Sequence, residues 1–193
     1  MAIIKPNNNT ISAITALPAA IPTGSLVKLL STSNTDVSSA SVSSTYITTT
    51  YDQYYFFLRG KVQSDGRGIT VRYLFANGSE ETGNYASVGS RIGNDGTYHN
   101  GTTTSFALNT DSTIGNGANE SFTFSGYFSN PTSNIYTSHF YGNLLYATTG
   151  DSFRMDHIGA RRNDGTAQHY GIKFYPTGGN FENINLEVYG VGK

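Results

Sequence analysis

The sequence predicts an all-β protein, an antiparallel β-sandwich of the jelly-roll type preceded by an extended arm. Short runs alternate apolar and polar residues, and a period of two is the signature of strands. Gly, Asn and Asp separate the runs, while β-branched residues, Gly and Ser interrupt every candidate amphipathic helix. Several short strands at this spacing, without helices, favour a sandwich.

Residues 1–25 are expected to form the extended arm. The stretch NNNTISAITALPAAIPTGS, from Asn7 to Ser25, contains two prolines and no charge, which argues against both a stable helix and a solvated linker. We expect this arm to dock on another protein and to bury its aliphatic side chains there: Ile3, Ile4, Ile11, Ile14, Leu17 and Ile21. Residues 26–193 then form the sandwich.

The Ser/Thr-rich stretch STSNTDVSSASVSSTYITTTY follows at the start of the sandwich. Its composition alone would also suit a disordered segment. Val37, Val42 and Ile47 provide sparse apolar anchors, and Ser and Thr are tolerated in a strand at a sheet edge. This stretch is therefore predicted to supply one or two edge strands.

Two strong alternating runs come next, YYFFLRGKV and ITVRYLFA. The connector between them, QSDGRG, is a turn signal. Together the two runs predict a β-hairpin.

Three later runs, SFTFSGYF, QHYGIKFYP and NINLEVYG, alternate in the same way. Their predicted inward faces are Phe122, Phe124 and Phe128, then Tyr170, Ile172 and Phe174, then Ile184, Leu186 and Val188. Two NDG triplets, starting at Asn94 and Asn163, predict tight turns with positive φ. Residues 91–104 and the polar segment 109–120 are expected to be long exposed loops.

The composition is poor in charge and rich in aromatic residues. Charged residues make up 13% of the chain, where about a quarter is usual, and aromatics also reach 13%, with 14 Tyr and 11 Phe. A surface of Ser, Thr, Asn, Gly and Tyr is typical of secreted, extracellular or assembled β proteins. The net charge of −1 gives no field that steers the chain toward nucleic acid, so no nucleic-acid partner is expected.

Disulfides, membrane insertion and export are not expected either. The chain has no Cys, which excludes disulfides and thiolate metal sites. No run approaches the roughly 18 apolar residues of a membrane span. The opening MAIIKP lacks the long apolar region of a secretory signal. A protein assembled inside a cell and released by lysis, as virion components are, would fit these features.

No motif predicts a catalytic, cofactor-binding or metal-binding residue. The histidines, none in an HxH or HExxH arrangement, are His99, His139, His157 and His169. The acidic residues of interest fall mostly in segments that resemble turns or loops: Glu80, Glu81, Asp111, Glu120, Asp151 and Asp156. Glycan cleavage would need two carboxylates about 5 to 9 Å apart, and nothing local marks such a pair. There is no GxSxG elbow.

Tyrosines give a stronger functional signal, because a flat ring with a polar tip suits both subunit interfaces and sugar stacking. Those expected in loops or on outer faces are Tyr46, Tyr51, Tyr55, Tyr85, Tyr98, Tyr127, Tyr136 and Tyr189. The pair Arg161–Arg162 could hold a phosphate or an acidic sugar, or simply solvate a strand end. Candidate interface or glycan contacts are Tyr127, Tyr136, Tyr98, Arg161 and Arg162, with an interface favoured over a glycan site.

From Leu26 to the C-terminus the sequence resembles a jelly-roll module of marine and cyanobacterial phage structural proteins. The resemblance rests on SLVKLLSTS, YDQYYFFLRGKV, ITVRYLFANGSEETGNYAS, GYFSNPT and GIKFYPTGGNFENINLEVYGVGK. In that family a YD-x-Y-x-F strand, an FANGS-like turn and a closing strand ending in L-x-x-Y-G recur. These motifs are specific to the fold and carry no active-site residue.

The resemblance implies a non-enzymatic virion protein displayed on the particle and built as an oligomer, often a trimer. Its partners would be other virion proteins of the capsid or tail, with a host surface glycan as a further candidate. A tail or head fibre that contacts the host is the first reading. A decoration protein that cements the capsid is the second, and a glycan-binding or glycan-cleaving domain is a distant third.

Overall fold

A computed structural model describes residues 26–83, 85–91, 97–109, 113–150, 152–162 and 167–192, without the side chains of residues 97–102. The predicted arm, both NDG turns and the Tyr98 side chain lie outside this part. The strands are β1 (Leu26–Val37), β2 (Ala40–Val42), β3 (Gln53–Val62), β4 (Ile69–Leu74), β5 (Tyr85–Arg91), β6 (Thr97–Thr103), β7 (Phe106–Ala107), β8 (Phe122–Ser129), β9 (His139–Ala147), β10 (Phe153–Arg162), β11 (Gly171–Pro176) and β12 (Phe181–Val191).

The described residues form two antiparallel sheets packed as a sandwich, which confirms the predicted fold class. An eight-stranded sheet has the order β1-β12-β3-β8-β9-β10-β5-β6, and a four-stranded sheet has the order β2-β11-β4-β7. If β5–β6 and β9–β10 are set aside, two four-stranded sheets remain, and the chain alternates between them except at β4 and β7, which follow one another in the same sheet. In each sheet the early strands pair with the late ones, as in a jelly roll.

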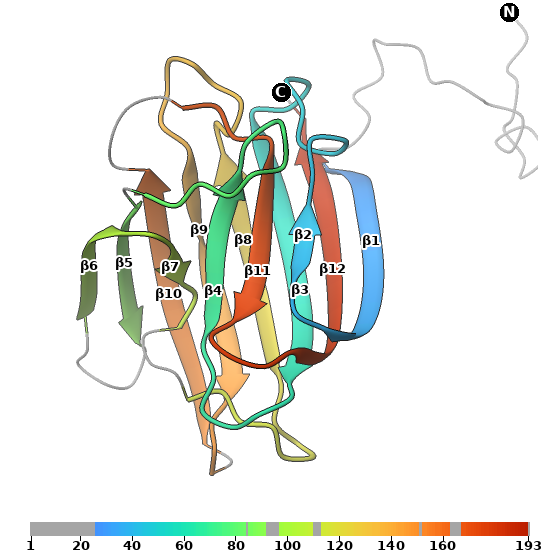
Figure 1. Cartoon of the computed structure of the whole chain (residues 1–193), viewed down its shortest axis with the longest axis vertical. Helices are drawn as coiled ribbons and strands as arrows, with labels where there is room; N and C mark the ends of the chain where they lie inside the picture. The colour runs from blue at the N-terminus through green and yellow to red at the C-terminus, as the bar shows by residue number, and fades with distance from the viewer. Residues whose placement is uncertain are drawn as a thin grey trace, which may run out of the picture.

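The two hairpins β5–β6 and β9–β10 are thus additions to the jelly roll, and they widen one sheet only. β10 joins them by pairing with both β9 and β5. Figure 1 shows the four-stranded sheet in front of the eight-stranded sheet, with β5 and β6 at the side where that sheet extends past it. The added strands therefore give the molecule a broad outer face.

Aromatic side chains dominate the core between the sheets. The predicted inward residues of β8, β11 and β12 are all buried, apart from Tyr170, which precedes β11 and is half-buried. The rings of Phe124 and Phe140 stack with centroids 5.2 Å apart. Phe140 also contacts Phe56 and Phe174, which belong to opposite sheets. Burial of each such ring contributes roughly 1.5–3 kcal/mol to stability.

The Ser/Thr-rich stretch forms edge strands, as predicted. β1 ends one sheet and β2 ends the other. Val42 and Ile47 are fully buried, while Val37 is half-buried. These sparse apolar anchors hold an otherwise polar segment against the core.

The predicted hairpin between YYFFLRGKV and ITVRYLFA is wrong. β3 pairs with β12 and β8, whereas β4 pairs with β11 and β7 in the other sheet. The connector does contain a residue with positive φ, Gly66. It carries the chain from one sheet to the other, because each strand obtains its partners from distant parts of the sequence.

The expectation of long exposed loops is also wrong in part. In the segment 109–120, Asn109, Ile114 and Glu120 are buried. Asn109 accepts a hydrogen bond from the Ile69 amide, at 2.9 Å. Within residues 91–104, the stretch Thr97–Thr103 forms β6.

Two further expectations about single residues are wrong. Tyr85 is fully buried, and its hydroxyl accepts a hydrogen bond from the Tyr73 amide at 2.8 Å. Asp156 lies within β10 and is fully buried. Both belong to the added hairpins, whose strands were not recognised in the sequence.

Candidate binding groove on the outer face of the eight-stranded sheet

A row of tyrosines crosses the outer face of the eight-stranded sheet. Successive residues of the row are direct cross-strand neighbours on β12, β3, β8, β9, β10 and β5: Tyr189, Tyr55, Tyr127, Tyr141, Gly159 and Val88. The ring centroids of Tyr55 and Tyr127 are 5.2 Å apart, and those of Tyr127 and Tyr141 are 5.5 Å apart. The row thus presents neighbouring rings, of which Tyr127 and Tyr141 are stacked, and it ends beside a glycine.

Two hollows flank this end of the row. One, of about 780 Å³, is lined by residues that include Ala86, Ser129, His139 and Arg161. The other, of about 580 Å³, is lined by residues that include Ser90, Ser125, Tyr127, Asn143 and His157. Both share Val88, Tyr141 and Gly159. Together they form a continuous groove over β8, β9, β10 and β5, which we call the outer groove.

Gly159 keeps the floor of the outer groove low. A Cβ atom at this position would have one heavy atom within 4 Å, Cγ1 of Val88 at 3.6 Å, which is an ordinary contact. Packing therefore does not require glycine here. Gly126 and Gly142 differ, because a Cβ at either would collide with the Phe124 ring and with backbone on the inner side of the sheet.

Polar groups along the outer groove are held in place by neighbouring side chains. The Gln53 amide donates to Oγ of Ser129 at 2.8 Å and to the Tyr141 hydroxyl at 2.9 Å. Nδ1 of His157 and Oδ1 of Asn143 share a hydrogen bond. Tyr141 is nevertheless 42% exposed and Val88 is 43% exposed. The groove therefore combines accessible apolar surface with positioned polar atoms.

The structure separates the predicted pair Arg161 and Arg162. Arg161 is exposed and lines the outer groove. Arg162, one residue further along the strand, has Nε 3.2 Å from Oε2 of the nearly buried Glu81. Alternation along β10 sends the two side chains to opposite faces. They cannot form one anion clamp.

Glu81 belongs to a second polar cluster with Ser138 and His169. Oγ of Ser138 lies 2.9 Å from Nδ1 of His169, and Nε2 of His169 lies 3.9 Å from Oε2 of Glu81. This order resembles a nucleophile, a base and an acid. Ser138 is 1% exposed and His169 is 0% exposed, however, so no substrate reaches the hydroxyl.

The protonation of His169 agrees with a structural role. Burial, together with the positive charge of Arg162, lowers its pKa to about 4. Its ring packs on Tyr73 and Phe75, with centroid distances of 4.8 and 5.7 Å. The neutral imidazole therefore ties the chain before β11 to the loop that follows β8.

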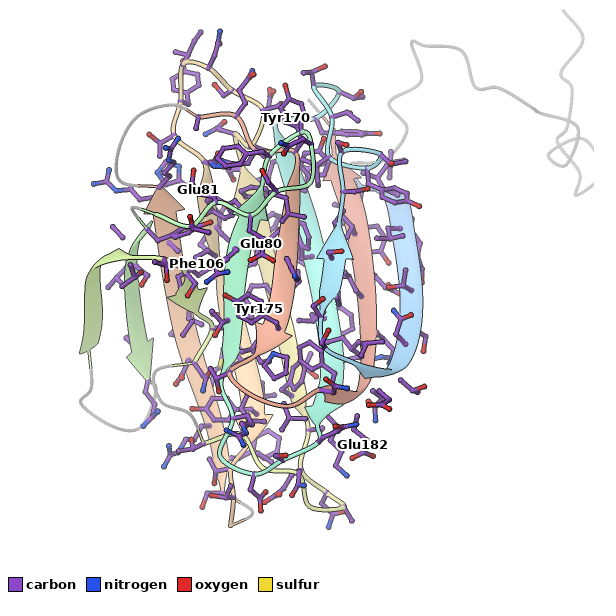
Figure 2. All side chains as sticks on the ribbon, in the orientation of Figure 1. Glu80, Glu81, Phe106, Tyr170, Tyr175 and Glu182 are labelled. Atoms are coloured by element: carbon purple, nitrogen blue, oxygen red, sulfur yellow. The ribbon has the colours of Figure 1, made fainter. Side chains whose placement is uncertain are left out.

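Glu80, the residue before Glu81 in the sequence, is held by two cations. Glu80 accepts from Arg72 at 2.5 Å and from Lys173 at 2.6 Å, and these bonds, led by the one from Lys173, lower its pKa. Glu80 and Tyr175 lie over the four-stranded sheet, whereas Glu81 lies toward the upper end of β10 (Figure 2). Glu80 and Glu81 are thus directed to separate clusters although they are adjacent in sequence.

Of the predicted contact residues, Tyr127 and Arg161 line the outer groove, and Tyr136 does not. Tyr136 is 63% exposed in the loop between β8 and β9. It borders a separate hollow of about 260 Å³ together with Asp52 and Thr132. Tyr136 therefore lies apart from the tyrosine row.

Sequence reasoning missed Tyr141, Gly159, Val88 and the Asn143–His157 pair. These residues come largely from HFYGNLLYA and FRMDHIGARR, which form β9 and β10. Alternation does not mark FRMDHIGARR as a strand, because the polar Asp156 is buried while the apolar Phe153 is exposed. Their cross-strand pairing needs the structure.

Among the residues that the structure describes, no group of three or more His, Asp or Glu side chains could hold a metal ion. No helix in that part of the chain is long and apolar enough to cross a membrane. Comparisons with family models, curated proteins and solved structures found no match to this chain.

Proposed function

We propose that this chain is a non-enzymatic structural protein displayed on the surface of a virus particle. Its jelly roll contacts the host, and residues 1–25 attach it to another virion protein. One observation carries the proposal: the outer groove lies largely on strands added to the jelly roll, β5, β9 and β10, on an exposed face. Surface elements added to a scaffold are where binding functions concentrate.

The resemblance to phage jelly-roll modules supports placing the protein on a virion. The composition agrees with it, because only 13% of the residues are charged. Such a surface suits a protein that works inside an assembly, where many copies convert weak single contacts into avidity. A homo-oligomer, often a trimer in that family, belongs to the same proposal.

The positions of the carboxylates support a non-enzymatic role. Asp156 is buried against Arg91, with Oδ1 3.3 Å from Nε. Glu120 is buried and accepts hydrogen bonds from the amides of Gly117 and Gly150. Glu80 is held between two cations. A glycosidase needs two carboxyl groups facing each other across the substrate, and these three serve separate structural bonds.

Capsid decoration is the alternative, and one observation favours it. Beyond the outer groove the same face carries Leu145, which is 40% exposed, and Phe153, which is 70% exposed. Leu145 is the direct cross-strand neighbour of Met155. Exposed apolar residues that lie close together suit lateral packing between subunits.

Purified particles provide the test. We expect mass spectrometry to find the protein in a few copies per particle, and the chain lacking residues 1–25 to be lost from particles although it folds. About one copy per major capsid subunit would indicate decoration. Absence of the protein from particles would overturn the proposal.

A further inference from the structure

We infer that the outer groove is a binding site for a glycan chain, which lies across β8, β9, β10 and β5 with a sugar ring against Tyr141. This inference deepens the proposed function by naming the class of ligand on the host surface. It depends on the proposed function only for the place where the protein encounters the glycan, the host surface. The chemistry of the groove carries the inference itself.

The size and shape of the groove suit a short oligosaccharide. Its hollows of about 780 and 580 Å³ meet at Gly159. Sites for small ligands generally measure about 300–1,000 Å³. Neighbouring strands lie about 4.8 Å apart, so four strands span about 14 Å. The groove is thus longer than one sugar ring.

The lining provides both kinds of contact that a sugar needs. The exposed ring of Tyr141 and its stacked neighbour Tyr127 offer flat apolar surface for the C–H face of a pyranose. Ser125, Asn143 and His157 offer hydroxyl, amide and imidazole groups at the same hollow. The Tyr141 hydroxyl is a further polar group, and its hydrogen bond from Gln53 fixes its position before any ligand arrives.

The charge of the lining restricts the ligand further. Among the described lining residues, Arg161 is the one with a formal charge, and none is a carboxylate. A polyanion such as nucleic acid requires many cations along its path. A chain of largely neutral sugars therefore fits the outer groove better than a polyanion does.

An extended peptide fits less well. β8, β9, β10 and β5 each pair with a strand on both sides. Their backbone donors and acceptors are therefore used within the sheet, and a peptide cannot join it as another strand. A second copy of the chain is the remaining alternative, and the apolar residues Leu145 and Phe153 beyond the groove suit that role better.

Gly159→Val provides the test, because a valine here would fill the floor shared by both hollows. The backbone at Gly159 is an ordinary strand, and the new Cβ meets Val88 at normal contact distance. Gly192→Val is the matched control, since Gly192 is exposed and a Cβ there meets nothing within 4 Å. Tyr141→Ala and Tyr141→Phe separate ring stacking from the hydroxyl.

The full chain, displayed on a multivalent carrier, would be screened on an array of neutral and acidic glycans. The strongest binder would then be titrated in solution. We expect the wild type and Gly192→Val to bind equally. Gly159→Val and Tyr141→Ala should bind at least about tenfold more weakly, and Tyr141→Phe should keep most of the affinity.

Three results would overturn the inference. One is that the wild type binds no glycan on the array, and another is that Gly159→Val binds as well as the wild type. The third is that Gly159→Val changes the oligomer mass, which would make the groove a subunit interface. Particle composition separates the two proposals: a protein present on particles that binds no glycan would refute the site and leave the virion role intact.

Discussion

Tyr141 and Gly159 face each other directly across the β9–β10 ladder, and only Tyr141 presents a side chain to the outer groove. The space beside Tyr141 exists because residue 159 has no side chain, and packing does not require a glycine at this position. We predict that Gly159→Val leaves the free energy of unfolding unchanged or raises it by up to about 1 kcal/mol, because strands favour β-branched residues. Urea unfolding measures this change.

The same substitution at Gly126 should have the opposite effect. Gly126 and Gly142 are directly opposed on the inner face, and a Cβ on Gly126 would meet the Phe124 ring and the Tyr141 carbonyl. Overpacking at this point should cost about 3 kcal/mol or more. Urea unfolding measures the free energy of unfolding of Gly126→Val and of Gly159→Val. Equal stability for Gly126→Val and Gly159→Val would show that the two faces are assigned wrongly.

His169 should make the protein sensitive to mild acid. Its pKa is lowered to about 4 in the folded chain, chiefly by burial, while the unfolded chain titrates near 6.5. Between these values only the unfolded state takes up the proton. The free energy of unfolding is therefore highest above pH 6.5 and falls by roughly 3 kcal/mol as the pH drops from 6.5 to 4.

NMR titration of the His169 imidazole measures this pKa directly. The ring should stay neutral in the native protein at pH 5.5, while a denatured sample titrates near the ordinary value. A native midpoint close to 6.5 would contradict the burial argument. His169→Gln should be less stable at neutral pH and should lose part of the slope between pH 6.5 and 4.

Glu120 should stabilise two loops at once. It accepts hydrogen bonds from the amide of Gly117 in the loop before β8 and from that of Gly150 in the turn between β9 and β10. Glu120→Ala removes both bonds, and because Gly117 and Gly150 are exposed, water can partly replace the lost acceptor; the change should cost about 1–2 kcal/mol. Glu120→Gln retains one acceptor oxygen and should cost less. Hydrogen exchange at Gly150 should accelerate in the alanine variant, and unchanged protection would argue against the anchor.

Two carboxylates, Asp156 and Glu80, should differ sharply in their contribution to the free energy of unfolding. Asp156 is fully buried between Arg91 and the hydroxyl of Tyr146, behind the outer groove. Asp156→Ala should cost about 3–5 kcal/mol, because it removes the fully buried carboxylate that pairs with Arg91. Glu80→Ala removes two partly exposed ion pairs, with Arg72 and Lys173, and should cost only about 1 kcal/mol. Urea unfolding measures the loss of stability in Asp156→Ala and in Glu80→Ala, and equal losses in the two variants would contradict this ranking.

The inward faces could be predicted from the sequence because alternation is a local property. Phe122, Phe124 and Phe128 are buried, as their even-numbered spacing along one strand predicts, because such residues lie on one face. The Ser/Thr-rich edge strands were predictable for a similar reason, since an edge strand needs few apolar anchors. Each of these inferences uses only residues close together in the chain.

Strand partners could not be predicted in the same way. The turn signal around Gly66 is genuine, yet the chain crosses between sheets there, because β4 pairs with β11 from far along the sequence. The outer groove could not be predicted from the sequence for the same reason. Val88, Tyr141 and Gly159 come from three separate strands, and only the order of the strands in the sheet brings them together.

Competition for adsorption tests the central claim most directly. Host cells would be incubated with the purified chain before particles are added, and bound particles would be counted. If the outer groove contacts the host, the wild type and Gly192→Val should reduce adsorption to the same extent, and Gly159→Val should not. If Gly159→Val blocks adsorption as well as the wild type, or if no form of the chain blocks it, the outer face is not the surface that binds the host.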